Sequence, residues 1–388
     1  MKTEHVRTPD KPVRVVLEGV PRVTFQAEPG RDAETNPFPS CLRACLEYLG
    51  DDLGYREFTW QGSTWRQSLT YVHLMGTTGA AFRLSWRPGW HMDNVAIMHM
   101  SDEPSAPFDR AFEAIGYDYE FLFPEEGHDT ESRWRARIVE SIRDKGRPVL
   151  GFGVVGPPEC CLITGYDEGG DVLIGWSFFQ DFPEFNAGLA FEPSGYFRKR
   201  DWFKDTHSAL IIGEKIEPPP SGEIYRQALR WALQVVRTPQ TTLYGGPRHN
   251  GLAAYTAWAE HLSHEFPAED MGVLRERYMV HNDAVGSVAE GRMYGACFFR
   301  QMADREPVMA EDLLAAAACY EAEHDLMWEI WNLTGGIGFS DEQVRKLAEP
   351  SVRRQIVPLV HQARDKDAKA ADLIEQALAK DSQRGDAG

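Results

Sequence analysis

The first half of the chain alternates short apolar runs with segments rich in Gly and Pro, a pattern typical of mixed helix and strand structure. Apolar residues three and four positions apart, followed by Gly50, predict a helix over residues 39–48. Two further segments with helical spacing predict helices over 107–115 and 131–144. Apolar and β-branched runs predict four strands, over 148–155, 160–164, 172–176 and 209–213.

A turn between two of these strands predicts a β-hairpin. Residues 167–170 read Asp-Glu-Gly-Gly and separate the apolar runs 160–164 and 172–176. An early helix followed by a mainly antiparallel sheet is the layout of an α+β domain.

A Pro-rich segment separates this half from a second half with helical spacing. Residues 217–222 read Glu-Pro-Pro-Pro-Ser-Gly, and three consecutive prolines continue neither a helix nor an inner strand. We therefore expect an α+β domain over residues 1–217, a linker over 218–223 and an all-α domain over 224–388. The helices expected in the second domain span 224–236, 251–264, 271–302, 310–333 and 342–379, the last broken or kinked at Pro350 and Pro358.

Charge and composition narrow the classes of function. The net charge is −18, and the chain has no cluster of Lys and Arg to neutralise phosphates, so we expect no nucleic-acid partner. No stretch has the about 18 apolar residues that a membrane helix requires, and residues 1–16 lack the apolar core of a signal peptide. We therefore expect a cytoplasmic protein with reduced cysteines, no membrane partner, no metal and no cofactor.

Four segments resemble parts of one protein family. Residues 41–50 (Cys-Leu-Arg-Ala-Cys-Leu-Glu-Tyr-Leu-Gly) resemble its nucleophile helix, and residues 74–83 (Leu-Met-Gly-Thr-Thr-Gly-Ala-Ala-Phe-Arg) resemble its glycine-rich segment. The predicted hairpin of 161–167 and 172–175 resembles the strand pair that presents its catalytic histidine. Residues 251–260 resemble part of its second domain. The family is the butirosin-biosynthesis acyltransferase group, which is similar in fold to bacteriocin-processing cysteine peptidases and to papain.

The resemblance implies a papain-like α+β domain followed by a helical domain, and a Cys–His–Asp/Asn apparatus that transfers an acyl group from a thioester to an amine. It implies a small-molecule amine as substrate, with an acyl carrier protein as a candidate donor. In the family's spacing, however, the nucleophile falls near Pro37 and the histidine at Glu159. The orienting residue falls near Gly175 or Trp176, so all three positions are substituted.

Two residues remain as candidates for catalysis. Cys41 would lie in the first turn of the predicted helix, where the helix dipole favours a thiolate; the alternative is a buried packing thiol. Glu159 precedes a strand and is a candidate general base or ligand of a substrate ammonium group; the alternative is a solvated loop residue.

Four tryptophans and one histidine are candidate substrate-binding residues. Aromatic faces bind cations, although large aromatic side chains also fill irregular cores. A histidine near the glycine-rich segment is a candidate replacement for the missing base, or a packed core group. These five residues are Trp60, Trp65, Trp90, Trp176 and His73.

Three hypotheses of function follow. The first is an acyl-transfer or amide-forming enzyme of small-molecule metabolism that uses Cys41 and Glu159. The second is a relative without the triad that binds a cationic small molecule in the same cleft, as a sensor or a non-covalent enzyme. The third is a metal-dependent enzyme, since carboxylate and histidine side chains recur at helical spacing in the second half. That set consists of Glu260, His264, Glu290, Glu321 and His324. A homodimer is a candidate assembly for any of them.

Overall fold

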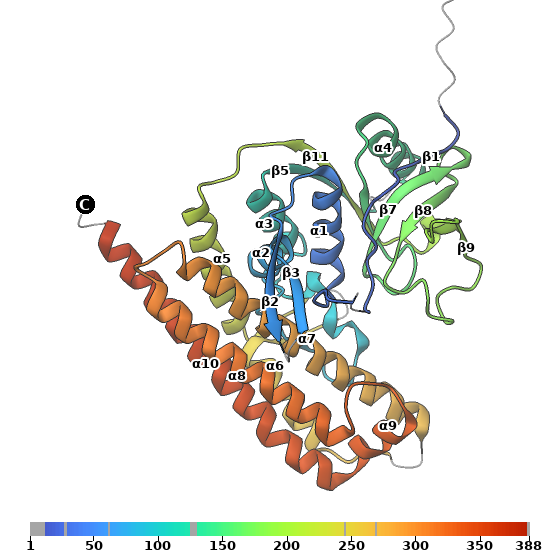
Figure 1. The fold of residues 1–388 in the computed structure, drawn as a ribbon. Coiled ribbons are helices and arrows are strands. Elements are labelled where there is room, and N and C mark those ends of the chain that lie inside the picture. The colour runs from blue at the N-terminus through green and yellow to red at the C-terminus, as the bar shows by residue number, and fades with distance from the viewer. Residues whose placement is uncertain are drawn as a thin grey trace, which may run out of the picture. The chain divides into compact units, whose positions relative to one another are not determined.

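The computed structural model describes residues 12–26, 29–60, 63–124, 130–243, 246–267 and 270–385, without the side chains of 58–60, 63, 384 and 385. It has a mixed α+β structure with a central antiparallel sheet (Figure 1). The chain forms two compact units, and each is discontinuous in sequence. Unit 1 combines residues 1–52 and 117–215, and unit 2 combines residues 53–116 and 216–388.

This division differs from the one expected from the sequence. The change of unit at residue 216 falls at the Pro-rich segment, but residues 53–116 belong to the helical unit and not to the first domain. The glycine-rich segment explains why. Gly76 leaves room for the ring of Phe298, and the indole of Trp231 donates to the carbonyl oxygen of Thr78 at 2.9 Å. The segment is thus built into the packing of later helices.

Unit 1 is organised around an antiparallel sheet. Its strand order is β5-β11-β6-β7-β8-β10-β9, and β1 pairs with β7 in addition. The strands are β1 (Val15–Val16), β5 (Tyr117–Leu122), β6 (Val149–Phe152), β7 (Cys160–Asp167), β8 (Val172–Trp176), β9 (Ala190–Phe191), β10 (Phe197–Arg200) and β11 (Ser208–Lys215). The predicted hairpin is confirmed as β7 and β8, joined by the short helix η3 (Glu168–Gly170).

Two helices of unit 1, α1 (Pro37–Leu49) and α4 (Thr130–Lys145), pack against β6 and β7. Helix α1 ends at Gly50, whose left-handed backbone and N–H group cap the last turn. It begins at Pro37, two residues earlier than predicted, so Cys41 lies in its second turn and not in its first. The short helix η4 (Trp202–Lys204) precedes β11.

Unit 2 is mainly helical, and it also contains short strands that an all-α domain would lack. Its α-helices are α2 (Leu69–Thr77), α3 (Ala106–Ile115), α5 (Ser221–Arg237), α6 (Gly251–Ser263), α7 (Met271–Ala303), α8 (Ala310–Thr334), α9 (Asp341–Ala348) and α10 (Pro350–Gly385). The hairpin of β2 (Tyr55–Trp60) and β3 (Ser63–Ser68) and the sheet β12 (Gln240–Thr241), β13 (Arg248–Asn250) and β4 (Ser85–Trp86) add strands. Two short helices, η1 (Met92–Val95) and η2 (Ile97–His99), follow β4.

The prolines of α10 and a glycine of α7 affect their helices in different ways, depending on where each lies. Pro350 begins α10, where its missing N–H costs no hydrogen bond, whereas the same helix continues through Pro358. Buried Ile356 and Val360 on either side of Pro358 provide packing that offsets the lost bond. Helix α7 runs unbroken through Gly291, which lets the carbonyl oxygen of Ala81 approach the helix.

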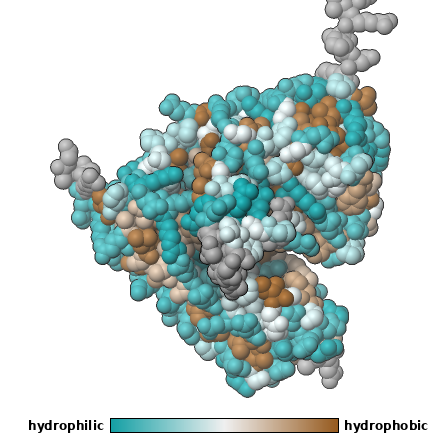
Figure 2. All heavy atoms as spheres, viewed as in Figure 1, coloured by the Kyte–Doolittle hydropathy of each residue, from teal (hydrophilic) through white to brown (hydrophobic). Residues whose placement is uncertain are grey.

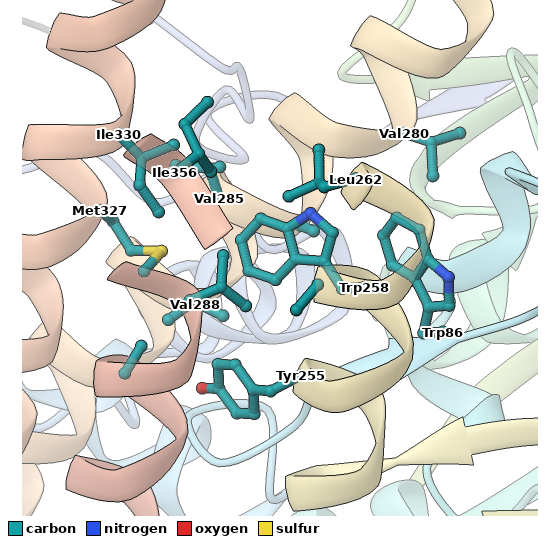
Figure 3. Packing of buried hydrophobic residues seen from close by; sticks show 14 of the residues in the cluster. Trp86, Tyr255, Trp258, Leu262, Val280, Val285, Val288, Met327, Ile330 and Ile356 are labelled. Atoms are coloured by element: carbon teal, nitrogen blue, oxygen red, sulfur yellow. The ribbon is translucent and has the colours of Figure 1, made fainter. Parts of the chain in front are cut away.

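The core of unit 2 is a cluster of large apolar side chains (Figure 3). Trp258 of α6 lies at its centre beside Trp86 of β4, with ring centroids 6.2 Å apart. Its indole N–H donates to Nδ1 of the buried His281 at 3.1 Å. Burial lowers the pKa of His281 to about 3, so this imidazole is neutral and accepts the bond.

The outer surface is mostly hydrophilic on the face shown in Figure 2, with scattered apolar residues. Within the described residues, no helix combines the length and the apolar character needed to cross a membrane.

A buried network of polar side chains joins four helices of unit 2. Arg292 of α7 donates from Nη2 to Oδ2 of Asp367 of α10 at 2.7 Å and to the hydroxyl of Tyr255 of α6 at 2.9 Å. Its Nη1 donates to the carbonyl oxygen of Ala81 at 2.8 Å. The hydroxyl of Tyr320 of α8 donates to Oδ1 of Asp367 at 3.1 Å. The guanidinium group therefore fixes four segments at one point.

Glu323 of α8 adds a second carboxyl group to this network. Its Oε1 accepts a hydrogen bond from Tyr255 and lies 3.4 Å from Nε of Arg292. One guanidinium faces two fully buried carboxyl groups, so the charges balance when one carboxyl holds a proton. Burial raises the pKa of Glu323 well above its usual range, and the positive charge of Arg292 offsets this only in part. We assign the proton to Glu323.

Replacing Arg292 should destabilise unit 2 strongly. In Arg292→Met the Asp367 carboxylate stays buried without its cation, which costs about 3–5 kcal/mol of unfolding free energy. Urea unfolding measures the loss. The matched control is Arg300→Met on the same helix, where an exposed pair with Glu321 is worth at most about 1 kcal/mol. Equal losses in the two variants would contradict the role given to the network.

The protonated state of Glu323 predicts a pH-dependent effect of Glu323→Gln. Because the pKa of Glu323 is raised in the folded protein above its ordinary 4.5, the wild type loses stability as the pH rises above that value. The amide cannot ionise, so the variant should be more stable near pH 8 by on the order of 1–3 kcal/mol, with little difference near pH 4. Thermal unfolding across this range, with Glu321→Gln as control, measures it. A loss of stability that is constant with pH would show that the carboxyl is ionised.

Candidate functional site

Several strands of unit 1 begin or end at one edge of the sheet. Phe152, the last residue of β6, pairs with Cys160, the first of β7, and with Ser208, the first of β11. The first turn of α1 lies here too, because the ring of Phe38 stacks on Phe152 with centroids 6.3 Å apart.

Two loops cover this edge. The hydroxyl of Ser177, just after β8, donates to the carbonyl oxygen of Val155 at 2.8 Å and so joins loop 177–189 to loop 153–159. We call these two loops, His207 and the first turn of α1 the strand-end site.

The three positions that match the family's triad all lie in the elements at this edge. Pro37 is the first residue of α1, and Glu159 directly precedes β7. Gly175 and Trp176 end β8. No side chain fits at position 175, because a Cβ there would overlap the carbonyl oxygen of Leu162. The edge therefore brings together a helix start, a strand start and the end of a neighbouring strand, with neither thiol nor imidazole at the three positions that the resemblance assigns to the triad.

Glu159 is half-buried at the strand-end site. Its backbone N–H donates to the carbonyl oxygen of Pro157 at 2.6 Å, and its own carbonyl oxygen accepts from the N–H of Gly153 at 3.1 Å. These bonds fix the backbone on both sides of the carboxylate. Burial raises the pKa of the Cys161 thiol on β7, and the negative charge of Glu159 adds to this rise in pKa.

Cys41 is sealed inside unit 1. Its side chain is 0% exposed, and its Sγ donates to the carbonyl oxygen of Cys160 at 3.5 Å. The backbone N–H groups that polarise a helix start belong to the turn before Cys41, and in that turn Pro37 and Pro39 have none. Cys41 is thus a packing thiol between α1 and β7, which is the alternative interpretation that the sequence left open.

The other thiols near Cys41 are buried and protonated. Burial raises the pKa of Cys45 and Cys160 well above their usual range and the pKa of Cys161 to about 12. All six cysteines of the chain are free and buried. A thiolate nucleophile needs an electropositive and accessible position, which Cys41, Cys45, Cys160 and Cys161, all 0% exposed, lack.

One histidine lies at this edge although the sequence analysis did not select it. The backbone N–H of His207 donates to the carbonyl oxygen of Phe152 at 2.7 Å, and its ring meets Phe123 edge-on at 5.5 Å. Burial lowers the pKa of His207, so the imidazole is neutral at physiological pH. Its position directly before a buried strand was the only signal in the sequence.

The five predicted substrate-binding residues divide between the two units. Trp176 belongs to unit 1, where it is buried against Tyr196 and donates from its indole to the carbonyl oxygen of Val20 at 3.1 Å. Trp65 and Trp90 belong to unit 2, with His73. The side chain of Trp60, also in unit 2, lies outside the described residues. Of the five predicted residues, only Trp176 belongs to the same unit as Glu159.

In unit 2, two of the predicted residues, Trp90 and His73, pack against other aromatic side chains. Trp90 adopts a left-handed backbone with a φ of 64° and contacts Trp86 and Phe266, with ring centroids 5.2 and 5.3 Å away. His73 of α2 packs near Phe298, and burial lowers its pKa to about 4. Trp65 is half-buried on β3.

The predicted metal ligands do not converge. Glu321 forms an ion pair with Arg300. Both ring nitrogens of His324 are engaged, by the carbonyl oxygen of Ala289 and by the indole of Trp328. Among the described residues, no group of three or more His, Cys, Asp or Glu side chains is arranged to hold a metal ion. The site that the third hypothesis would build from Glu260, His264, Glu290, Glu321 and His324 is therefore not assembled among the described residues.

Comparison with known proteins adds no identification. No protein-family model matches the chain, and no curated protein sequence is significantly similar to it.

Alkylation rates should separate the thiols by burial and leave Cys41 among the slowest. In the native protein, iodoacetamide should label Cys297 and Cys319 first, because these two keep 8% and 7% exposure. Cys41 should react no faster than Cys45, and all six should react at once in guanidinium chloride. Mass spectrometry of quenched samples measures each rate, with Cys41→Ser as control. Rapid labelling of the native protein that disappears in this variant would restore Cys41 as a nucleophile.

Proposed function

We propose that unit 1 binds a cationic small molecule at the strand-end site, as a sensor or as an enzyme that does not use a covalent cysteine intermediate. The amine class comes from the resemblance to the butirosin-biosynthesis acyltransferase group, and we assign unit 1 to a papain-like fold on the same ground. The packing of α1 against two antiparallel strands supports that assignment. Six reduced thiols support a cytoplasmic location.

One observation carries the proposal: Glu159, at the position where the resemblance places the catalytic histidine, is half-buried at the strand-end site, while the candidate thiol of Cys41 is sealed. Glu159 directly precedes β7 and is half-buried, whereas Cys41 is 0% exposed. An acyl-enzyme intermediate on Cys41 would require a thiolate in a position without access to substrate. A carboxylate binds an ammonium group through charge-assisted hydrogen bonds.

The surrounding charges favour such a ligand. The two loops of the strand-end site contain three carboxylates, Glu159, Asp181 and Glu184, and neither Lys nor Arg. The whole chain carries a net charge of −18, so the long-range field attracts cations as well.

Glu159→Gln should weaken amine binding. Titration of putrescine and butylamine, followed by calorimetry at low ionic strength, should give an affinity at least about tenfold lower in the variant, since a charge-assisted bond is lost. Added salt should reduce the difference. The control is Glu217→Gln, an exposed carboxylate in the Pro-rich linker, which should bind like the wild type. Equal affinities in wild type and Glu159→Gln, or saturable acyl transfer that depends on Cys41, would contradict the proposal.

A further inference from the structure

Helix α8 of unit 2 has carboxyl side chains but no basic residue to balance them. Residues 310–334 contain six Asp and Glu and neither Lys nor Arg. Three of the acidic residues, Glu321, Asp325 and Glu329, follow one another at four-residue spacing, so they lie on one side of the helix, and all three are exposed. Helix α7, which packs along α8 (Figure 1), contributes no Lys or Arg over residues 278–291.

Two of these three carboxylates have no cation beside them. Glu321 forms an ion pair with Arg300 of α7. Among the described residues, Asp325 and Glu329 form neither an ion pair nor a side-chain hydrogen bond. Like charges four residues apart on a helix repel each other, so this pair of carboxylates destabilises α8. A cation that binds here would remove the repulsion.

The only exposed tryptophan among the described side chains lies next to these carboxylates. Trp328 keeps 40% of its surface in water. Asp325 precedes it by three positions, so the two side chains are neighbours on the helix surface. We call Asp325, Trp328 and Glu329 the acid–tryptophan face. All three belong to unit 2.

Hydrogen bonds fix the exposed indole in one orientation. Nδ1 of His324 lies 2.9 Å from the carbonyl oxygen of Ala289 of α7, so the neutral imidazole donates there and accepts at Nε2. The indole N–H of Trp328 donates to this Nε2 at 2.9 Å. The ring of Trp331 lies 5.2 Å from that of Trp328, and its own N–H donates to Oδ1 of Asn282 at 2.9 Å. A partner that stacks on Trp328 therefore loses little entropy in ordering it.

This combination of groups matches an arginine side chain. A guanidinium group is planar, so it can stack on an indole ring and at the same time donate hydrogen bonds to a carboxylate. A lysine ammonium group is compact and strongly hydrated, and it gains less from the ring. Anionic lipid headgroups would be repelled, and two copies of the acid–tryptophan face would repel each other.

We propose that the acid–tryptophan face docks a basic segment of a partner protein. An arginine side chain of the partner stacks on Trp328 and pairs with Asp325, and further positive charge of the segment lies opposite Glu329. This inference concerns unit 2 and is independent of the function proposed for unit 1.

The indole resonances of the full-length protein test where such a segment binds. With ¹⁵N-labelled tryptophan, the Trp328 signal is assigned by its loss in Trp328→Phe. Added tetra-arginine peptide should shift this signal and that of Trp331 saturably, because a stacked guanidinium changes the environment of both rings. The signal of Trp258, which is buried in the core, should stay in place.

Affinities of labelled peptides, measured by fluorescence anisotropy at low ionic strength, test the chemistry. Trp328→Ala should weaken binding of tetra-arginine about twofold to fivefold and leave binding of tetra-lysine nearly unchanged. Asp325→Asn/Glu329→Gln should weaken binding of both peptides, by less when salt is added. All three side chains are exposed, and an unchanged melting temperature verifies folding.

The matched control for charge is Glu311→Gln/Glu342→Gln. It removes the same number of negative charges from exposed positions of unit 2 outside the face, so tetra-arginine should bind as it does to the wild type. The matched control for the exposed ring is Leu314→Ala, which removes a 48% exposed side chain from the same helix and should also have no effect.

Four results would overturn the inference. The first is a Trp328 signal that does not move with tetra-arginine, and the second is equal affinity of wild type and Trp328→Ala for this peptide. The third is an equal shift with tetramethylammonium chloride at matched charge, which would identify a small cation as the ligand. The fourth is self-association of the wild type that Trp328→Ala abolishes, which would identify a second copy of the chain.

Discussion

The packing of the helical unit depends on one buried guanidinium group. Removing a charge from water costs several kcal/mol, and the cost is recovered only when every partner stands at hydrogen-bond distance. Arg292 donates hydrogen bonds to groups of α6 and α10 and to the backbone at Ala81, and its Nε lies 3.4 Å from a carboxyl oxygen of α8. Apolar contacts alone would tolerate small shifts of one helix along another, whereas this network does not. The glycine at position 291 then allows the backbone at Ala81 to come close enough to α7.

In unit 1, glycine leaves room where two backbones come close together, and a small thiol side chain fills a gap between a helix and a strand. Gly175 leaves space for a neighbouring carbonyl oxygen, and Cys41 fills the gap between α1 and the start of β7. These packing requirements leave no room for a cysteine apparatus at the strand-end site. A carboxyl or amide side chain cannot be placed at position 175, and the thiol that the sequence offers is needed for packing. The groups of the strand-end site that water reaches include the half-buried Glu159 and the exposed rings of Phe182 and Phe185.

Local signals in the sequence located several elements but missed others, among them α2, β5 and the β2–β3 hairpin, and beyond the hairpin of β7 and β8 they did not identify the partners of any element. The apolar stripe places α1 within two residues at its start, and the Asp-Glu-Gly-Gly turn locates the hairpin of β7 and β8. The assignment of residues 53–116 to unit 2 could not be predicted, because it rests on contacts with Trp231 and Phe298, far along the chain. The partner of Arg292 at position 367 is equally remote.

The discontinuity of the two units has a consequence for synthesis on the ribosome. All of unit 1 has been translated once residue 215 is made, so its sheet can form while residues 53–116 stand out as a long loop between two of its segments. Closing such a loop costs little more entropy than closing a short one. Residues 53–116, in contrast, must wait for α5 and α7, which are translated later. The apolar side chains around Leu74 and Phe82 therefore pass through a period without their partners, in which they are open to aggregation.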